Sequence, residues 1–581
     1  MLFFKKTDYN LKKNYCTDFK VLNILIQIKL IAMKITIGEY LISQLSNYGV
    51  NMMFGVPGDY TLSFLDIVED SKYMQWIGCC NELNASYAAD GYARINGMGA
   101  LSITYGVGAL SAVNGVAGSF AENVPVVIIS GRPSEQTVEN KALVHHSLGN
   151  GEFDIFYEMF SKVTYDQAII TERYARRQID DILYKCYVEK LPVYIELCSD
   201  LAKMEIEIED NPVTNKLIPT SRKEVLQQFI KDVEDILRNS ANQMIIADYE
   251  VLRYNLTDKV NKLVEKAKVP ATTLNMGKGA FDETSKYYAG LYAGILEDKK
   301  VNDIVMNTDC ALLIGAKLTD SDSGLKNPNP NMQFIIVNPF YCKIANKTYN
   351  NIFIGDVIDE LSKLSYHSDL IIPQSSISVA PATDQELTQV RLYELFEQYI
   401  KGDAIIIAEQ GTSFFGISTM RLPINTSFIG QPLWGSIGYT LPATLGAALA
   451  DRSRRTYLLI GDGSLQFTVQ EISTMLKLKL NCVILVDNNN GYTVEKVIHG
   501  MHREYNAINM WEYSKLPDVL NKDKSAAVTI KVSSEKDLMK AFDICDRNPE
   551  KLILIELILP EFDMPEFLEN LAKILNAQNH Y

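Results

Sequence analysis

YLLIGDGS at residues 457–464 and CVILVDNNNGY at residues 482–492 are the two stretches that decide the fold. Each opens on a nearly continuous apolar run, which is typical of a strand buried on both faces of a parallel sheet. Residues 466–480, between them, carry apolar side chains at helical spacing. A strand, a helix and a second strand form a unit with parallel strands, so both strands are predicted to end at one edge of an α/β sheet.

The polar residues after these two strands have the chemistry of a metal and diphosphate site. Asp462 follows the first strand, Asn489 follows the second, and Gly491 lies just beyond. A carboxylate, an amide oxygen and a backbone carbonyl are hard oxygen ligands that suit Mg²⁺ and leave positions for diphosphate oxygens. Gly461 and Gly463 let the backbone approach a phosphate at the start of the next helix. Either motif alone is only a turn, but the pair predicts a metal-diphosphate site.

The same alternation of strands and helices extends over most of the 581 residues. It predicts three α/β blocks, each a doubly wound parallel sheet, at residues 34–210, 211–367 and 386–581. Residues 368–385 belong to a stretch rich in Ser, Pro and Ala and are predicted to be a linker. Three domains agree with the length, since one domain usually takes roughly 100 to 200 residues.

Residues 1–33 differ from the rest of the chain in composition and pattern. They combine several lysines with an apolar stretch that Asn23, Gln27 and Lys29 interrupt. This stretch is too short and too broken to span a bilayer, and it lacks the features of a signal or transit peptide. We therefore interpret residues 1–33 as an upstream extension, with Met33 as the functional start.

Composition excludes several classes of partner. Lys plus Arg number 56 against 71 Asp plus Glu, which gives a formal net charge of −15. Such a chain, with no Lys/Arg-rich run, repels phosphodiester backbones, so neither nucleic acid nor a membrane is an expected partner. The nine cysteines form no C-x-x-C unit. This disfavours a zinc site or a disulfide framework and indicates a reducing compartment, the cytoplasm.

Further motifs carry a resemblance to a known family. GDGSLQFTVQEISTMLKLKLNCVILVDNNNGYTVE resembles the thiamine diphosphate signature, and its continuation GYTVEKVIHG is similar to the pyruvate and indolepyruvate decarboxylase branch. Other matches are FGVPGDYTLSFLD from Phe54, CNELNASYAADGYAR from Cys80, HHSLG from His145, EQGTSFFG from Glu409 and QPLWGSIGYT from Gln431. The resemblance runs from Lys34 to the C-terminus. It implies pyrimidine-binding, middle and diphosphate-binding domains, with thiamine diphosphate and Mg²⁺ as cofactors.

The resemblance also implies which residues hold and activate the cofactor. Glu82 matches the carboxyl that hydrogen-bonds the pyrimidine ring and so activates the cofactor's own imino base, a bond that burial strengthens. By itself, a Glu in the first turn of a helix is more often a capping carboxylate. Ile437 matches the bulky residue that holds the cofactor bent. The remaining cofactor contacts are expected from Thr412, Gly461, Gly463, Ser464 and Asn489.

Four further residues match the groups that handle protons in these decarboxylases: Asp59, His145, His146 and Glu495. Loss of CO₂ consumes negative charge, which a poorly solvated pocket favours, and the resulting enamine needs a proton before an aldehyde can leave. Two adjacent histidines with two carboxylates can serve as an acid/base cluster near neutral pH.

The resemblance places the substrate side chain against Gln410, Phe414, Phe415 and Val494. An aromatic wall with Val rather than Ile resembles the broad-specificity enzymes, so the expected reaction is non-oxidative decarboxylation of indolepyruvate, phenylpyruvate or branched-chain 2-oxo acids. One methylene discriminates by only about 1 to 3 kcal/mol, so substrates are expected to overlap. A pyruvate decarboxylase proper is the first alternative.

Assembly and two rival functions complete the expectations. In this superfamily Glu82 of one subunit and Asp462 of its neighbour serve one site, so at least a homodimer is implied, and a homotetramer is the habit of the family. A carboligase similar to acetohydroxyacid synthase would share Glu82 and the metal site but not the need for the His145-His146 pair. A non-catalytic relative that only binds cofactor is the other alternative.

Overall fold

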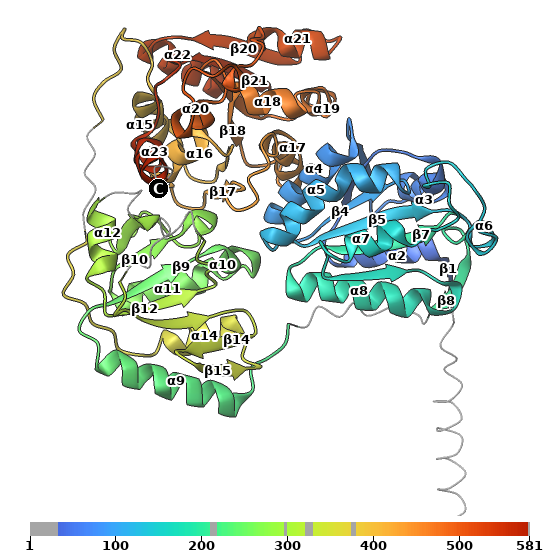
Figure 1. Ribbon diagram of the computed structural model, residues 1–581, viewed down its shortest axis with the longest axis horizontal. Helices are drawn as coiled ribbons and strands as arrows, with labels where there is room; N and C mark the ends of the chain where they lie inside the picture. Colours follow the sequence, from blue (N-terminus) through green and yellow to red (C-terminus); the bar gives the residue numbers. More distant parts are fainter. Residues whose placement is uncertain (1–32, 209–217, 295–298, 320–328, 373–378, 579–581) are drawn as a thin grey trace, which may run out of the picture.

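The computed structural model describes residues 33–208, 218–294, 299–319, 329–372 and 379–578. They form three α/β domains. In Figure 1 the third domain lies at the top, the first at the right and the middle domain at the lower left. The predicted boundary at residues 210 and 211 falls outside the described residues, as do residues 1–32 and part of the predicted linker. No helix among the described residues is both long and apolar enough to cross a membrane.

A six-stranded parallel sheet, in the order β3-β2-β4-β5-β7-β6, forms the centre of the first domain. Helices α4 and α5 lie on one face of this sheet, and α2 and α8 lie on the other (Figure 1). The strands are β2 (Met52–Gly55), β3 (Gln75–Gly78), β4 (Gly99–Ile103), β5 (Val126–Arg132), β6 (Asp166–Ile169) and β7 (Val193–Cys198). The helices are α2 (Ile37–Asn47), α3 (Leu62–Asp70), α4 (Glu82–Asn96), α5 (Val107–Ala121), α6 (Glu135–Glu139), α7 (Ile155–Phe160) and α8 (Ala175–Glu189).

An antiparallel ribbon of β1 (Met33–Thr36) and β8 (Glu205–Ile208) closes this domain. Met33 pairs with Ile208 in the ribbon. Among the described residues, the first strand thus begins at Met33, the residue interpreted above as the functional start.

The middle domain is built on a seven-stranded sheet in the order β11-β10-β9-β12-β13-β14-β15. Five strands are parallel, as predicted, but β14 and β15 continue the sheet as an antiparallel edge. Tight turns join β13 to β14 and β14 to β15, and such short connections permit only antiparallel pairing. The strands are β9 (Gln243–Ala247), β10 (Ala271–Thr273), β11 (Tyr288–Leu291), β12 (Cys310–Ile314), β13 (Gln333–Val337), β14 (Tyr341–Ile344) and β15 (Lys347–Asn350). The helices are α9 (Lys223–Arg238), α10 (Tyr249–Arg253), α11 (Thr257–Ala267), α12 (Lys299–Met306) and α14 (Ile354–Leu361).

The third domain has a six-stranded parallel sheet in the order β17-β16-β18-β19-β21-β20. The two strands that decide the fold, β18 and β19, are central and parallel, as predicted. The strands are β16 (Ile405–Ala408), β17 (Ser427–Ile429), β18 (Thr456–Gly461), β19 (Val483–Asn488), β20 (Ala527–Val532) and β21 (Leu552–Ile558). The helices are α15 (Gln389–Tyr399), α16 (Thr412–Ser418), α17 (Thr440–Ala450), α18 (Asp462–Thr468), α19 (Glu471–Lys477), α20 (Thr493–Ile498), α21 (Leu516–Leu520), α22 (Glu535–Arg547) and α23 (Glu566–Gln578).

The single helix predicted at residues 466–480 was wrong. The structure has two shorter helices, α18 and α19, which meet at Val469 and Gln470. Thr468 ends the first helix, and its hydroxyl donates to the Gly438 carbonyl at 2.7 Å. A contact with a distant loop thus interrupts a pattern of apolar residues that continues through the break.

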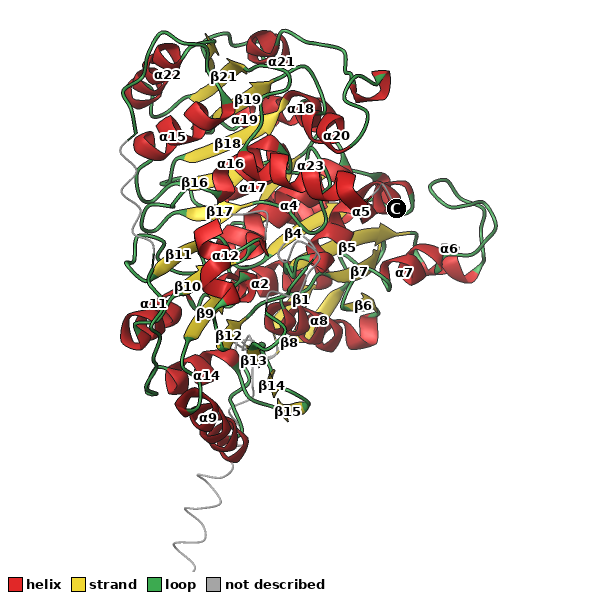
Figure 2. Ribbon diagram, turned by 60° about the vertical axis from the view of Figure 1, so that its left-hand side comes forward, coloured by secondary structure: helices red, strands yellow, loops and turns green. Residues whose placement is uncertain are grey.

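Helices α4 and α17 join the first and third domains, and they lie side by side in Figures 1 and 2. Their backbones approach closely because glycine lies at the crossing. A Cβ on Gly446 would lie 1.8 Å from the Ala88 carbonyl oxygen, and a Cβ on Gly91 would lie 2.2 Å from that of Ala443. One hydrophobic core continues through this contact from the first sheet into the third.

Candidate active site

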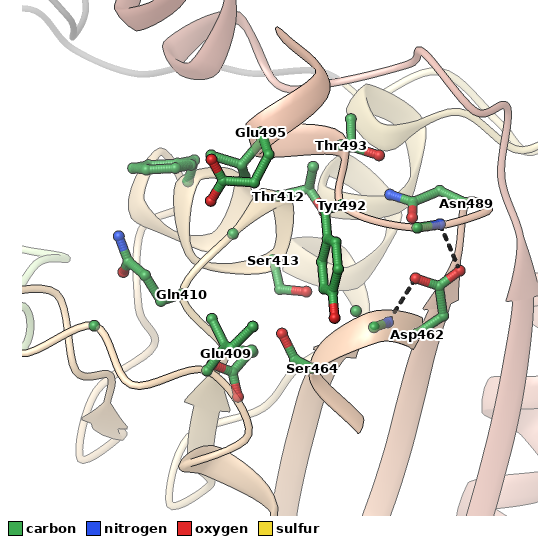
Figure 3. A pocket seen from close by; sticks show the side chains of 18 residues that line it. Glu409, Gln410, Thr412, Ser413, Asp462, Ser464, Asn489, Tyr492, Thr493 and Glu495 are labelled. Atoms are coloured by element: carbon green, nitrogen blue, oxygen red, sulfur yellow. Dashed lines mark hydrogen bonds between the residues drawn. The ribbon is translucent and has the colours of Figure 1, made fainter. Parts of the chain in front are cut away.

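A cavity lies at the carboxyl ends of β16, β18 and β19 in the third domain. This is the edge of a parallel sheet at which α/β proteins usually bind ligands. Figure 3 shows Asp462 and Asn489 at one end, Gln410 and Glu495 toward the other, and Tyr492 between them. The lining residues with predicted roles are Gln410, Thr412, Phe415, Ile437, Gly461, Asp462, Gly463, Ser464, Asn489, Gly491, Val494 and Glu495.

Asp462 is the first residue of α18, directly after β18. Its carboxylate accepts hydrogen bonds from Gly463 N at 2.7 Å and from Gly491 N at 3.2 Å (Figure 3). Burial raises the pKa of Asp462 to about 6, and these backbone donors offset the effect only in part. A metal ion bound beside Asp462 would stabilise the charged form of this buried carboxyl.

Asn489 lies beside Asp462, as the parallel strands predicted. Gly461 at the end of β18 pairs with Asp487 in β19, which brings the two following loops to the same edge. The Oδ1 atom of Asn489 is buried and has no hydrogen-bond partner among the described residues. Buried polar atoms are nearly always satisfied, so this oxygen fits a ligand to a hard cation. The residues present therefore fit Mg²⁺, because the buried Asn489 oxygen lies beside the Asp462 carboxylate and has no other partner among the described residues.

A close backbone approach shapes the floor of the cavity. A Cβ on Gly463 would lie 2.6 Å from the ring of Tyr492, so that ring rests on the first turn of α18. Ser464 and Thr412 line the same space from α18 and α16. Tyr492 and Ser413 also line the cavity, and sequence reasoning had given them no role. The GYT motif contained Tyr492, but residue type alone did not show where the ring points.

Glu409 is a second buried carboxyl in this cavity to which sequence reasoning gave no role. It accepts hydrogen bonds from Thr440 Oγ1 at 2.5 Å and from Gly438 N at 3.2 Å. Burial raises its pKa to about 7. These bonds hold the segment around Ile437, whose side chain the family resemblance implies to be the bulky support of the cofactor.

Three of the four predicted substrate-pocket residues line the cavity, namely Gln410, Phe415 and Val494. Phe414 is absent from the lining of this cavity, and its ring packs on Phe428 and Phe415 in the hydrophobic core. Successive residues of a helix point about 100° apart. In α16 only one of the two adjacent phenylalanines therefore faces the cavity.

The predicted proton-handling residues of the first domain form a separate, partly exposed cluster. His145 Nε2 forms a short hydrogen bond with the Asp59 carboxylate, and His146 Nε2 lies 3.5 Å from it. Tyr60 stacks on His145, with ring centroids 5.1 Å apart, and donates to the His145 carbonyl at 3.2 Å. Asp59, His145 and His146 are thus brought together, but within the described chain none of them lines the third-domain cavity.

Glu82 is the first residue of α4, and Asn81 caps that helix by accepting from Asn84 N at 2.8 Å. A Cβ on Gly108, in the first turn of α5, would lie 3.2 Å from Glu82 Oε1. The carboxylate therefore sits at the positive end of a second helix. Glu82 is also absent from the cavity lining of the described chain.

Comparison with known proteins identifies the family. The N-terminal TPP binding domain of thiamine pyrophosphate enzymes matches residues 35–153, their central domain matches 230–364, and their C-terminal TPP binding domain matches 413–555. An alpha-keto-acid decarboxylase of Mycobacterium leprae is 36% identical over 551 residues, covering 94% of this chain and 96% of its own length. Pyruvate decarboxylase isozyme 1 of Saccharomyces cerevisiae is 37% identical over 563 residues, covering 94% and 99%.

Proposed function

This chain belongs to the thiamine pyrophosphate enzyme family and is a 2-oxo acid decarboxylase, and we propose that its substrates are bulky 2-oxo acids. The proposed substrates are indolepyruvate, phenylpyruvate and branched-chain 2-oxo acids, which lose CO₂ to give aldehydes. Thiamine diphosphate is the cofactor, and we propose Mg²⁺ as its metal. The metal and diphosphate site is proposed because Asp462 is buried beside the Asn489 oxygen, which has no hydrogen-bond partner within the described part of the chain.

The third domain offers a complete set of groups for the diphosphate end of the cofactor. Asp462, Asn489 and the Gly491 carbonyl would hold Mg²⁺, while Gly461, Gly463, Ser464 and Thr412 would contact the diphosphate. When bound, thiamine diphosphate supplies an electron sink for the pair released as CO₂ leaves. Ile437 would support the bend between its two rings, and Glu409 keeps the Ile437 segment in place through Gly438 and Thr440.

We propose that a second copy of the chain completes each site. Glu82 would hold a proton on the pyrimidine ring, yet it lies outside the cavity of its own chain. The same holds for the Asp59, His145 and His146 cluster, which is partly exposed in the single chain. A homodimer that places the first domain of one copy over the cavity of the other would unite both groups. A homotetramer would consist of two such pairs.

Proton transfer is proposed for Glu495, Asp59, His145 and His146. Glu495 lines the cavity from the first turn of α20. The hydrogen bond between His145 and Asp59 holds the imidazole in a fixed orientation, which is how a carboxylate commonly prepares a histidine for proton transfer. These groups would deliver the proton that releases the aldehyde.

The residues expected beside the substrate side chain support the bulky substrates. Gln410, Phe415 and Val494 form its wall, and Val494 leaves more space than an isoleucine would. Pyruvate is the second candidate substrate, and the identity with a yeast protein named pyruvate decarboxylase favours it. Discrimination between acids of different size through one methylene amounts to about 1 to 3 kcal/mol.

A panel of substrates tests the proposal. CO₂ release and aldehyde formation are measured for pyruvate, phenylpyruvate, indolepyruvate and 4-methyl-2-oxopentanoate, with thiamine diphosphate and Mg²⁺ present. We expect kcat/KM for at least one bulky acid to exceed that for pyruvate by about tenfold or more. A clear preference for pyruvate would favour the second candidate. Condensation of two pyruvates would identify a carboligase, and cofactor binding without turnover would identify a non-catalytic relative.

A further inference from the structure

One buried carboxylate that the proposed reaction does not use lies between the first and third domains. Glu471 is the first residue of α19 and is fully buried. Its Oε2 accepts a hydrogen bond from Cys80 N at 3.2 Å and another from Asn84 Nδ2 at 2.7 Å. Both donors belong to the first domain, on either side of Glu82 in the sequence. A third-domain carboxylate thus binds the beginning of the helix that carries Glu82.

These two bonds fix the first turn of α4. Cys80 immediately precedes the capping residue Asn81, and Asn84 lies in the first turn. The Cys80 thiol also contacts the Gln470 carbonyl, at 3.4 Å. Free N–H groups at a helix start allow the first turn to fray unless side chains satisfy them. Since Glu82 is the first residue of this turn, the position of its side chain depends on the turn being held.

No ion pair to the Glu471 carboxyl is found among the described residues, and the hydrogen bonds to its Oε2 come from Cys80 N and Asn84 Nδ2. The Glu471 carboxylate faces the amino ends of α4 and α19, whose dipoles favour a negative charge. The second oxygen, Oε1, is buried and accepts no hydrogen bond within the described residues.

Glu471 also lies close in sequence to the proposed metal site. Helix α18 begins at Asp462, and α19 follows it after two residues. Residues 462–471 therefore run from the cavity, at Asp462, to the start of α4, which Glu471 contacts. This segment links the proposed diphosphate site to the helix that carries Glu82.

We propose that Glu471 is a positioning residue for Glu82. It holds the first turn of α4 at a fixed distance from α19 and thereby sets the orientation of the Glu82 carboxyl at the amino end of α5. This inference rests on the proposed function of Glu82. It adds a residue that touches neither substrate nor cofactor to the machinery that activates the cofactor.

Two substitutions test the proposal in the full-length protein. Glu471→Ala removes the acceptor, and Glu471→Gln keeps an oxygen for Cys80 and Asn84. Glu535→Gln is the matched control, because Glu535 is also buried and accepts from a distant backbone N–H, Thr383 N, at 2.7 Å, but on α22. If the alanine variant does not fold, Asn84→Ala removes the main donor instead.

Two readouts are measured for each variant. The first is amide hydrogen exchange of residues 80–85 without cofactor, and the second is kcat and KM with thiamine diphosphate, Mg²⁺ and the best 2-oxo acid. For Glu471→Ala we expect exchange to accelerate about tenfold or more in this segment and kcat to fall about tenfold, with KM changed less than about threefold. Glu471→Gln is expected to lie closer to the unaltered protein, and Glu535→Gln to match it.

Unchanged exchange at residues 80–85 in both Glu471 variants would overturn the proposal. A fall in kcat without that acceleration would also overturn it, because the effect would not run through α4. Failure of the proposed function is recognised separately, by absence of CO₂ release from the unaltered protein. The exchange measurement needs no cofactor and still decides whether Glu471 fixes the start of α4.

Discussion

Three buried carboxyls with raised pKa values surround the end of β18 and β19. Burial raises the pKa of Asp462 to about 6, and it raises those of Glu409 and Asp487 to about 7. Asp487 accepts a hydrogen bond from Ser413 Oγ at 2.7 Å, so it ties α16 to the end of β19. Such clustered carboxyls with displaced titration are characteristic of functional sites.

The role of Asp462 predicts a selective loss of metal-dependent binding. For Asp462→Ala we expect the dissociation constant of thiamine diphosphate with excess Mg²⁺ to rise about tenfold or more, because a charged ligand to the cation is removed. Calorimetry with and without EDTA measures this. The unaltered protein should lose affinity with EDTA, and the variant should respond little. Asp543→Ala, at an exposed carboxylate of α22, is the control. Equal EDTA sensitivity in both variants would contradict the assignment.

Glu409 predicts a dependence of stability on pH. Its pKa in the folded protein is about 7, above the ordinary value of 4.5, so the folded state holds the proton more tightly than the unfolded chain. Its contribution to stability is full below about pH 4.5 and is lost as the pH rises through about 7. We expect cofactor-free Glu409→Gln to be more stable than the unaltered protein at pH 8, by up to about 3 kcal/mol.

The difference between the two proteins in thermal unfolding, followed by calorimetry from pH 4.5 to 8, measures this effect. It should approach zero at the acidic end of the range. A Glu409→Gln variant that is less stable than the unaltered protein at pH 8 would show that Glu409 has a lowered pKa, contrary to its burial.

Residue types and order were enough to predict which polar groups meet in the third domain. Asp462 and Asn489 each follow a strand, and parallel strands bring their following loops together. The same reasoning did not distinguish Phe414 from Phe415, because the direction of a side chain depends on where α16 begins. Glu409 and Tyr492 gave no signal, since a Glu or Tyr near a loop is ordinary until its burial is known.

At the scale of elements, the pairing of α4 with α17 sets the relation between the first and third domains. The sequence predicted both helices only as parts of α/β blocks, and it did not indicate that they cross. A crossing depends on contacts between residues more than 300 positions apart. One example is the Tyr439 hydroxyl, which donates a hydrogen bond to the Asp90 carboxylate at 2.5 Å. Local periodicity predicts helices and strands but not contacts between distant residues.

A substitution at Gly446 tests how much stability depends on the close approach of these two helices. Alanine there would gain up to about 1 kcal/mol of helix propensity, but its Cβ would lie 1.8 Å from the Ala88 carbonyl oxygen. We therefore expect Gly446→Ala to destabilise the protein by about 1 to 3 kcal/mol or more. Thermal unfolding measures it. Gly78→Ala is the control, because the nearest atom to its Cβ would be 3.4 Å away. A stabilised Gly446 variant would contradict the close approach.

At the scale of the whole molecule, the two groups of residues proposed to form one site lie apart within a single chain. The cavity is lined entirely by third-domain residues, whereas Glu82, Asp59, His145 and His146 belong to the first domain. Packing of α4 on α17 within one chain joins the first and third domains through one hydrophobic core. In this arrangement the first domain does not cover the cavity of its own chain, which is the reason to expect a second copy.

Mixing two inactive variants tests this central claim most directly. Glu82→Gln lacks the proposed activating carboxyl and Asp462→Ala lacks the proposed metal ligand, and each is expected to be nearly inactive alone. After the two are unfolded, mixed equally and refolded together, hybrid dimers contain one site with both residues intact. We expect CO₂ release to recover to about one quarter of that of the unaltered protein, from half hybrids with one of two sites restored. A mixture as inactive as its components would contradict a site shared between two copies.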